Sequence, residues 1–293
     1  MPAGLRTCAR NCLLAGALGD AWGGPYEGRT GPLQPTFPEA PRLSDDTWLT
    51  VATCEAIVLD RGRVHPERIA ERFKEWFEAG RVTGVGSATL KALRDLAAGA
   101  HWALAGARGE FASGSGAAMR AAPLSFFLDP SVDADRRTIR DVSRITHHSD
   151  EAYAGALAVI VALRLCARLA AVPQDLLSVV AADLPDTAVR DRLLDLSGYR
   201  GSPTDAALRF GCSGHVVEAV PIALFVAASA ADEPLASVIS TAVSLGGDAD
   251  TIAAIAAQLA AISGRPIPDT FVARLPELPQ IGPVLDRFVS LLR

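Results

Sequence analysis

Apolar residues recur at helical spacing along most of this chain, and this pattern limits the possible fold more than any other feature of the sequence. Blocks rich in Ala, Leu, Arg, Glu and Val alternate with short clusters of Gly, Pro and Asp, which is typical of helices joined by turns. Strand signals are scarce, because convincing alternating runs of Val, Ile, Thr and aromatic residues are absent. The pattern therefore predicts an all-α fold, with about a dozen helices around one core.

The expected helices follow from the spacing of apolar residues. They cover 5–18, 46–60, 66–79, 88–105, 117–127, 135–146, 150–171, 173–182, 187–196, 203–210, 216–231, 234–243, 251–262 and the last dozen residues. The longest irregular segment, 24–46, carries five prolines, and a Gly-rich stretch occupies 111–119. Long irregular loops inside compact domains are usually functional or disordered.

Composition favours one compact domain over residues 1–293, because 49% of the residues are hydrophobic and only 21% are charged. The formal net charge is -5, and no run of Lys and Arg stands out. The chain therefore lacks the basic footprint of a protein that binds nucleic acid or an anionic membrane. A nucleic acid stays open as a substrate.

Several features favour a soluble, cytoplasmic protein. The five cysteines include no C-x-x-C pair, which favours a reducing compartment over a disulfide framework. The run LLAGALG resembles the core of a signal peptide, but Asp20 interrupts it at once. Arg164 and Arg168 interrupt the best candidate for a membrane span.

Two acidic clusters stand at the beginnings of two expected helices. The motif SDDT at 44–47 precedes WLTVATCEAIVL, and GGDADT at 246–251 precedes IAAIAAQLAAI. Ser, Thr and Asp are favoured helix caps, and an acid near a helix N-terminus gains ~0.3–1 kcal/mol, so one such cluster alone is ordinarily a cap. Two clusters, each followed by a helix that is mostly apolar, hold more carboxylate than capping requires.

A metal site explains the excess of carboxylates over what helix capping requires, if the two helix starts meet. Clustered, buried carboxylates repel one another unless a cation neutralises them. Carboxylate and hydroxyl oxygens are hard ligands that suit Mg²⁺ or Mn²⁺ better than zinc. Two such ions, held ~3.5–4 Å apart, would orient a diol and activate water. Sequence spacing does not decide whether the helix starts converge, so capping and metal binding both stay open.

Five motifs in a fixed order resemble the ADP-ribosylglycohydrolases. This family includes dinitrogenase reductase-activating glycohydrolase and the ADP-ribosyl-arginine and ADP-ribosyl-serine hydrolases. The motifs are GALGDAWGGPYEG at 16–28, SDDT at 44–47, GSGAAMRAAPL at 114–124, THH at 146–148 and GGDADTIAAIAAQLAAISG at 246–264. Each motif is weak by itself, but the ordered series covers nearly the whole chain and is a specific match.

The resemblance implies an all-α fold that holds two divalent cations, Mg²⁺ or Mn²⁺, between SDDT and DADT. It also implies that Glu27 reaches the active site from a mobile loop, for which the Pro-rich segment would be the lid. The implied metal ligands are Ser44, Asp45, Asp46, Asp248, Asp250 and Thr251. The implied substrate contacts are Gly114, Ser115, Gly116, Met119 and His147, with Gly214 and His215 lining the pocket.

Three of the motifs depart from the usual family pattern. Ser44 replaces a Thr but keeps the hydroxyl, so we expect metal binding to survive. Ser115 replaces an Asn that helps to bind ADP-ribose, and Ser149 with Asp150 replaces the end of the commoner THPHP motif. These departures discourage a simple transfer of arginine specificity to this chain.

By resemblance, the activity is cleavage of the bond between ADP-ribose and a modified target, with an ADP-ribosylated protein side chain ranked first. Glu27 would move protons or position the water. O-acetyl-ADP-ribose and ADP-ribosylated nucleic acid are alternative substrates. A dinuclear-metal phosphohydrolase and a non-catalytic ADP-ribose-binding regulatory protein are the rival hypotheses.

Overall fold

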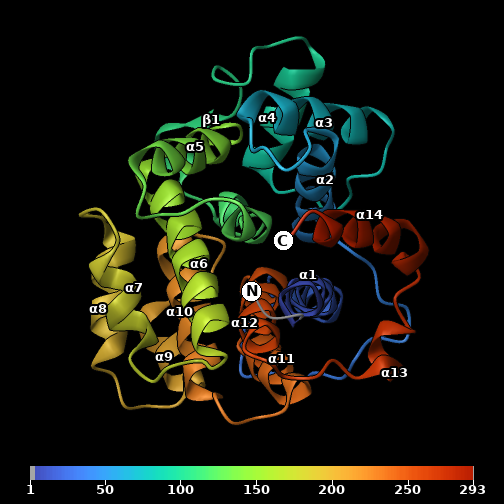
Figure 1. The fold of residues 1–293 in the computed structure, drawn as a ribbon. Coiled ribbons are helices and arrows are strands. Elements are labelled where there is room, and N and C mark those ends of the chain that lie inside the picture. The colour runs from blue at the N-terminus through green and yellow to red at the C-terminus, as the bar shows by residue number, and fades with distance from the viewer. Residues whose placement is uncertain (1–3, 293) are drawn as a thin grey trace.

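The computed structural model describes residues 4–292, and helices dominate it, which confirms the all-α prediction (Figure 1). A single parallel pair of two-residue strands, β1 (Ala107–Arg108) and β2 (His147–His148), is the one sheet among the described residues. The α-helices are α1 (Gly4–Gly23), α2 (Asp45–Leu59), α3 (Pro66–Glu78), α4 (Ser87–Ala97), α5 (Asp133–Arg144), α6 (Asp150–Leu169), α7 (Leu176–Ala182), α8 (Ala188–Ser197), α9 (Pro203–Phe210), α10 (Val216–Ser229), α11 (Leu235–Ser244), α12 (Ala249–Ile262), α13 (Asp269–Val272) and α14 (Leu278–Ser290). Four short 3₁₀ segments are η1 (Gly24–Tyr26), η2 (Gly109–Ala112), η3 (Ser115–Ala117) and η4 (Ala122–Phe126).

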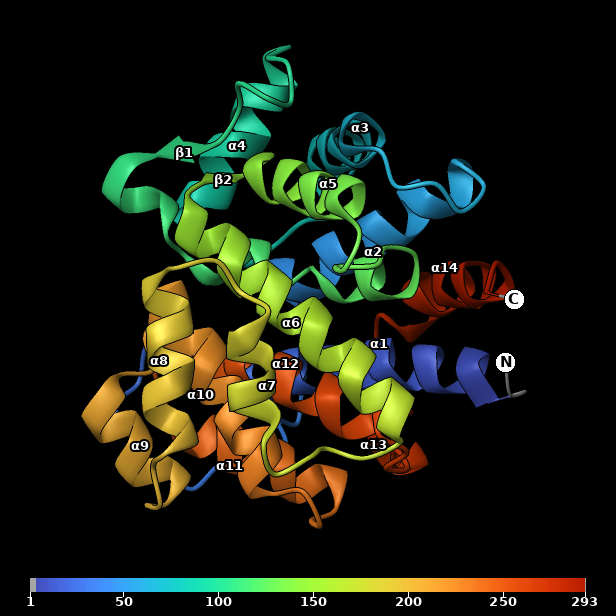
Figure 2. The ribbon, with the colours of Figure 1, turned by 60° about the vertical axis from the view of Figure 1, so that its left-hand side comes forward.

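Helix α12 lies at the centre of the fold, and every one of its residues is buried. It packs along α1, with α10 and α11 also against it (Figures 1 and 2). Gly23 permits the close approach of α1, because a Cβ there would lie 2.4 Å from the Cα of Asp250. The packing of α1 against α12 therefore sets the position of the second acidic cluster.

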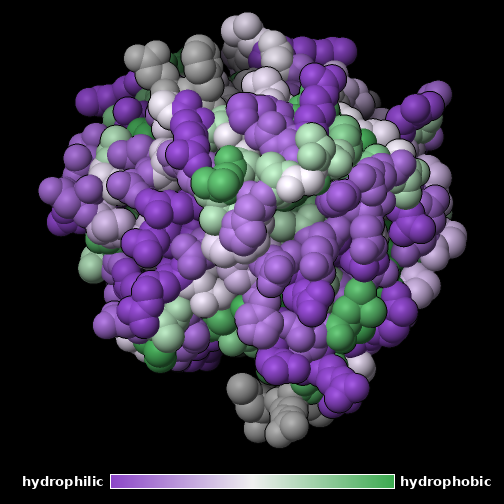
Figure 3. All heavy atoms as spheres, turned by 90° about the horizontal axis from the view of Figure 1, so that it is seen from above, coloured by the Kyte–Doolittle hydropathy of each residue, from purple (hydrophilic) through white to green (hydrophobic). Residues whose placement is uncertain are grey.

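Helix α6 is long and apolar enough to cross a membrane by length and composition. In the fold, 72% of its most apolar stretch is buried inside the protein, where it packs against α5 and α10. Figure 2 shows it running through the middle of the molecule. On the face shown in Figure 3, hydrophilic residues predominate and apolar residues form small scattered groups.

Three expected helices differ from the structure. The helix expected over 5–18 continues to Gly23 as α1. Spacing predicts a helix over 88–105, but α4 ends at Ala97, because Gly99 takes a left-handed conformation (φ 90°) and donates its N–H back to the carbonyl of Leu96. The segment 117–127 forms 3₁₀ turns instead of an α-helix, and Pro123 lacks the N–H that a continuing helix would need. The short α13 and the strand pair were not predicted.

Candidate active site

The two acidic helix starts converge on one cavity of about 210 Å³. Asp45 and Asp46 reach it from the first turn of α2, while Asp248 and Asp250 reach it from the start of α12. Glu27, which directly follows η1, completes the group: one carboxylate oxygen each from Glu27, Asp248 and Asp250 lie within 4.8 Å of one another. The fold thus brings together acids that lie far apart in the sequence.

The sequence-predicted site residues divide into two groups. Those that line the cavity are Glu27, Asp45, Asp46, Gly114, Ser115, Gly116, Met119, His147, Gly214, Asp248, Asp250 and Thr251. Ser44 does not line the cavity, and its hydroxyl caps α2 by accepting a hydrogen bond from the N–H of Asp46 at 3.2 Å. His215 is exposed and does not line the cavity; its backbone instead forms a bridge with Gly114.

Burial perturbs the ionisation of these acids strongly. Burial, followed by the negative charge of Asp20, raises the pKa of Asp45 to about 8. Burial and neighbouring carboxylates also raise the pKa values of Asp46 and Asp250 well above the ordinary range. The pKa of Asp248 rises to about 6, again mainly through burial. Without a bound cation, the fold therefore disfavours the charged form of these four carboxyl groups.

The donor set fits divalent cations. One carboxylate oxygen of Asp46 and one of Asp248 are buried without a hydrogen-bond partner in the described structure. A buried carboxylate oxygen without a partner is costly, and a cation offsets that cost by coordinating it. Carboxylate and hydroxyl oxygens are the ligands that Mg²⁺ and Mn²⁺ prefer.

Asp20, inside α1, holds the first acidic cluster in place, and the sequence analysis missed this role. It is fully buried and accepts hydrogen bonds from the backbone N–H groups of Ser44 (3.0 Å) and Thr47 (3.2 Å). The Thr47 hydroxyl donates a third bond at 2.5 Å. Asp20 thus caps α2 from a neighbouring helix. The signal was present in the sequence, because an acid inside a mostly apolar helix needs partners when it is buried.

The segment that carries Glu27 is joined to the second acidic loop by backbone hydrogen bonds. The N–H of Gly28 donates to the carbonyl of Gly247, and the N–H of Gly247 donates to the carbonyl of Arg29, both at 2.8 Å. Gly247 (φ 63°) also passes so close to Cys212 that a Cβ would lie 2.0 Å from its carbonyl oxygen. Glu27 and the loop before α12 therefore form one backbone unit.

Comparison with known proteins agrees with the resemblance seen in the sequence motifs. The model of the ADP-ribosylglycohydrolase family matches residues 1–293. This chain belongs to the ADP-ribosylglycohydrolase family. An uncharacterized protein of Archaeoglobus fulgidus is 31% identical over 285 residues, which cover 91% of this chain and 90% of the relative. A solved structure titled "ADP-ribosylglycohydrolase-related protein complex" has the same fold, with a TM-score of 0.74 and 24% identity over 98% of this chain and 99% of that one.

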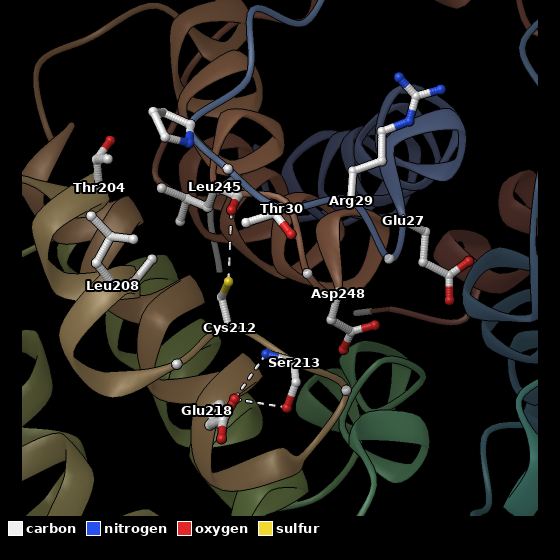
Figure 4. A pocket seen from close by; sticks show the side chains of 17 residues that line it. Glu27, Arg29, Thr30, Thr204, Leu208, Cys212, Ser213, Glu218, Leu245 and Asp248 are labelled. Atoms are coloured by element: carbon white, nitrogen blue, oxygen red, sulfur yellow. Dashed lines mark hydrogen bonds between the residues drawn. The ribbon is translucent and has the colours of Figure 1, made fainter.

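The protein has a second cavity that sequence reasoning did not anticipate. It has a volume of about 550 Å³ (Figure 4). Its lining shares Glu27, Gly214 and Asp248 with the lining of the first cavity. Leu208 of α9 lines it, and Glu218 of α10 accepts hydrogen bonds from the N–H (2.9 Å) and hydroxyl (2.7 Å) of Ser213. These residues meet through the packing of α9, α10 and the loop before α12, so a cavity between them could not be predicted from their spacing in the sequence.

Proposed function

We propose that this ADP-ribosylglycohydrolase hydrolyses the glycosidic bond between ADP-ribose and a modified target, and so releases ADP-ribose. The observation that carries the proposal is the convergence of Glu27 with both acidic helix starts on one cavity. A protein side chain is the first-ranked target. The five free cysteines support action in the reducing cytoplasm.

Two divalent cations, Mg²⁺ or Mn²⁺, belong to the proposal. The residues that would hold them are Ser44, Asp45, Asp46, Asp248, Asp250 and Thr251. When bound, such cations orient two adjacent ribose hydroxyls and lower the pKa of water. Ser44 stays in this set because its oxygen retains a lone pair beyond the one that caps α2.

Glu27 performs the proton transfer in this proposal. Water attacks the anomeric carbon of the ribose, the bond from that carbon to the target atom breaks, and Glu27 accepts a proton from the water and passes one to the leaving atom. Its side chain points into the space beside Asp248 (Figure 4). Glu27 is exposed, whereas Asp45, Asp46, Asp248 and Asp250 are buried and committed to the cations.

The two adjoining cavities suit a substrate with two parts. The Gly-rich loop at 114–116 and His147 line the smaller cavity, where backbone N–H groups and a neutral imidazole can meet a diphosphate. The larger cavity then receives the target side chain. Its lining includes three carboxylates, from Glu27, Glu218 and Asp248, against one basic side chain, that of Arg29, which favours a protein target over a polyanionic nucleic acid.

A substrate panel tests the proposal. ADP-ribosylated arginine, ADP-ribosylated serine, ADP-ribosylated nucleic acid and O-acetyl-ADP-ribose would be incubated with Mg²⁺ or Mn²⁺ and scored for free ADP-ribose. We expect release from a protein-type conjugate that chelation abolishes. Release of ADP-ribose only from nucleic acid or only from O-acetyl-ADP-ribose would show that the target is not a protein side chain. The absence of turnover on every substrate would favour a non-catalytic ADP-ribose-binding protein.

A further inference from the structure

We propose that Arg120 and Thr146 act as a buried positioning relay that fixes the proton of His147 on Nε2, so that this nitrogen donates a hydrogen bond to a diphosphate oxygen in the smaller cavity. The diphosphate in this statement rests on the proposed function. The relay itself rests on the geometry of three buried side chains, so the two parts can fail separately.

Arg120 is the first member of the relay and has an unusual environment for a guanidinium. Its side chain is 1% exposed, stacks on the ring of Phe73 at 4.9 Å, and forms no salt bridge among the described residues. Its Nη2 donates to the Thr146 hydroxyl at 2.8 Å and to the Val142 carbonyl at 3.2 Å. Because a guanidinium only donates, the Thr146 oxygen must accept in this contact.

Thr146 passes this constraint to His147. Thr146 is fully buried, and its oxygen lies 2.8 Å from Nδ1 of His147. A buried threonine hydroxyl can donate to the carbonyl four residues earlier, as that of Thr53 does. Thr146 makes no such hydrogen bond among the described residues. The carbonyl four residues before it, that of Val142, accepts a hydrogen bond from Arg120. The hydroxyl proton of Thr146 therefore has one partner, Nδ1, since a buried hydroxyl proton without an acceptor would be costly.

His147 then presents Nε2–H to the cavity. Its side chain is 2% exposed, and burial followed by the charge of Arg120 lowers its pKa to about 3, so the ring is neutral at physiological pH. With Nδ1 accepting, the single ring proton must sit on Nε2. Gly116 leaves room for this face of the ring, because a Cβ there would lie 2.6 Å from Cε1. Nε2 has no hydrogen-bond partner among the described residues, and a diphosphate oxygen would supply the acceptor.

Nitrogen-15 NMR of the full-length protein, labelled at histidine, tests the relay directly. We expect wild type and Thr146→Ser to show His147 as a single neutral tautomer with its proton on Nε2. Thr146→Val should broaden or shift the His147 signals and weaken the binding of ADP-ribose, measured by calorimetry, by roughly tenfold. Thr53→Val removes an equally buried hydroxyl and should change neither the tautomer nor the affinity.

The outcomes separate the two parts of the proposal. A proton on Nδ1 in the wild-type protein would overturn the relay, and so would an unchanged His147 tautomer in Thr146→Val. A changed tautomer with unchanged ADP-ribose affinity in Thr146→Val would instead refute the proposed contact with the diphosphate. An Nε2–H tautomer in a protein that binds no ADP-ribose would leave the relay standing and refute the proposed ligand. Failure of Thr146→Ser to restore both the tautomer and the affinity would show that the position matters only for packing.

Discussion

Raising the pH from 6.5 to 8 should destabilise the metal-stripped protein. The pKa of Asp45 is raised from 3.8 to about 8, so in this range the folded protein holds a proton that the unfolded chain has lost. Because the pKa of Asp45 is higher in the folded state than in the unfolded state, its contribution to stability is fully present when the pH is below the unfolded-state pKa. The contribution is lost as the pH rises toward the folded-state pKa. Over about 1.5 pH units, at 1.36 kcal/mol per unit, Asp45 alone accounts for about 2 kcal/mol.

Titratable groups near Asp45 also affect how stability changes between pH 6.5 and 8. The pKa values of Asp46 and Asp250 are also raised, so these residues add to the loss in the same direction. His147 acts in the opposite direction, because its pKa is lowered to about 3 from 6.5, but its contribution is already complete above pH 6.5. Stability should therefore fall across the range instead of rising.

Thermal unfolding, followed by circular dichroism on metal-stripped protein at several pH values, measures this loss. A loss of about 2 kcal/mol corresponds to a fall in Tm of roughly 3 °C for 293 residues, because the entropy of unfolding grows with chain length. Mg²⁺ or Mn²⁺ should reverse the fall at pH 8, because the cations bind the deprotonated carboxylates of the folded state. Asp46→Asn should flatten the slope, whereas Asp286→Asn, at an exposed ion pair, should not. A Tm that is constant or rises between pH 6.5 and 8 would refute the reasoning.

Three further substitutions test separate parts of the structure. Asp20→Asn should turn an amide NH₂ toward the backbone N–H groups that Asp20 caps at the start of α2. Calorimetry should then show at least about tenfold weaker Mn²⁺ binding with the helical circular dichroism retained, and unchanged affinity would contradict this role. Gly23→Ala should cost about 1–3 kcal/mol in urea unfolding, because its methyl group would meet the α12 backbone, and a neutral result would show that α1 can shift. Leu208→Trp should narrow the larger cavity and slow the turnover of ADP-ribosylated proteins several-fold, while ADP-ribose itself still binds. Loss of ADP-ribose binding in this variant would instead indicate that ADP-ribose occupies the larger cavity.

Helical periodicity predicted most of the fold, because an apolar stripe is a local property of the sequence. It failed where one residue changed the backbone. Gly99 ended α4 earlier than the alanine-rich sequence indicated, and Pro123 lies where 3₁₀ turns replace a predicted helix. The strand pair β1 and β2 consists of two residues each, too few for any alternating pattern to appear.

The acidic part of the site was predictable because two similar motifs carried the same surplus of carboxylates. The motif spacing did not reveal what holds those motifs. Asp20 acts across a helix–helix contact, and the segment after Glu27 is fixed by backbone hydrogen bonds to Gly247, which carry no side-chain signature. Their roles became visible only once the packing of α1, α2 and α12 was known.

The identity of the product tests the central claim most directly. Wild type and Glu27→Gln would be incubated with an ADP-ribosylated protein and Mn²⁺, and the released nucleotides identified by mass spectrometry. We predict intact ADP-ribose from wild type, with Glu27→Gln at least about 100-fold slower, although it still binds ADP-ribose. Release of AMP with ribose phosphate, or equal rates for the two proteins, would contradict glycosidic hydrolysis at this cavity.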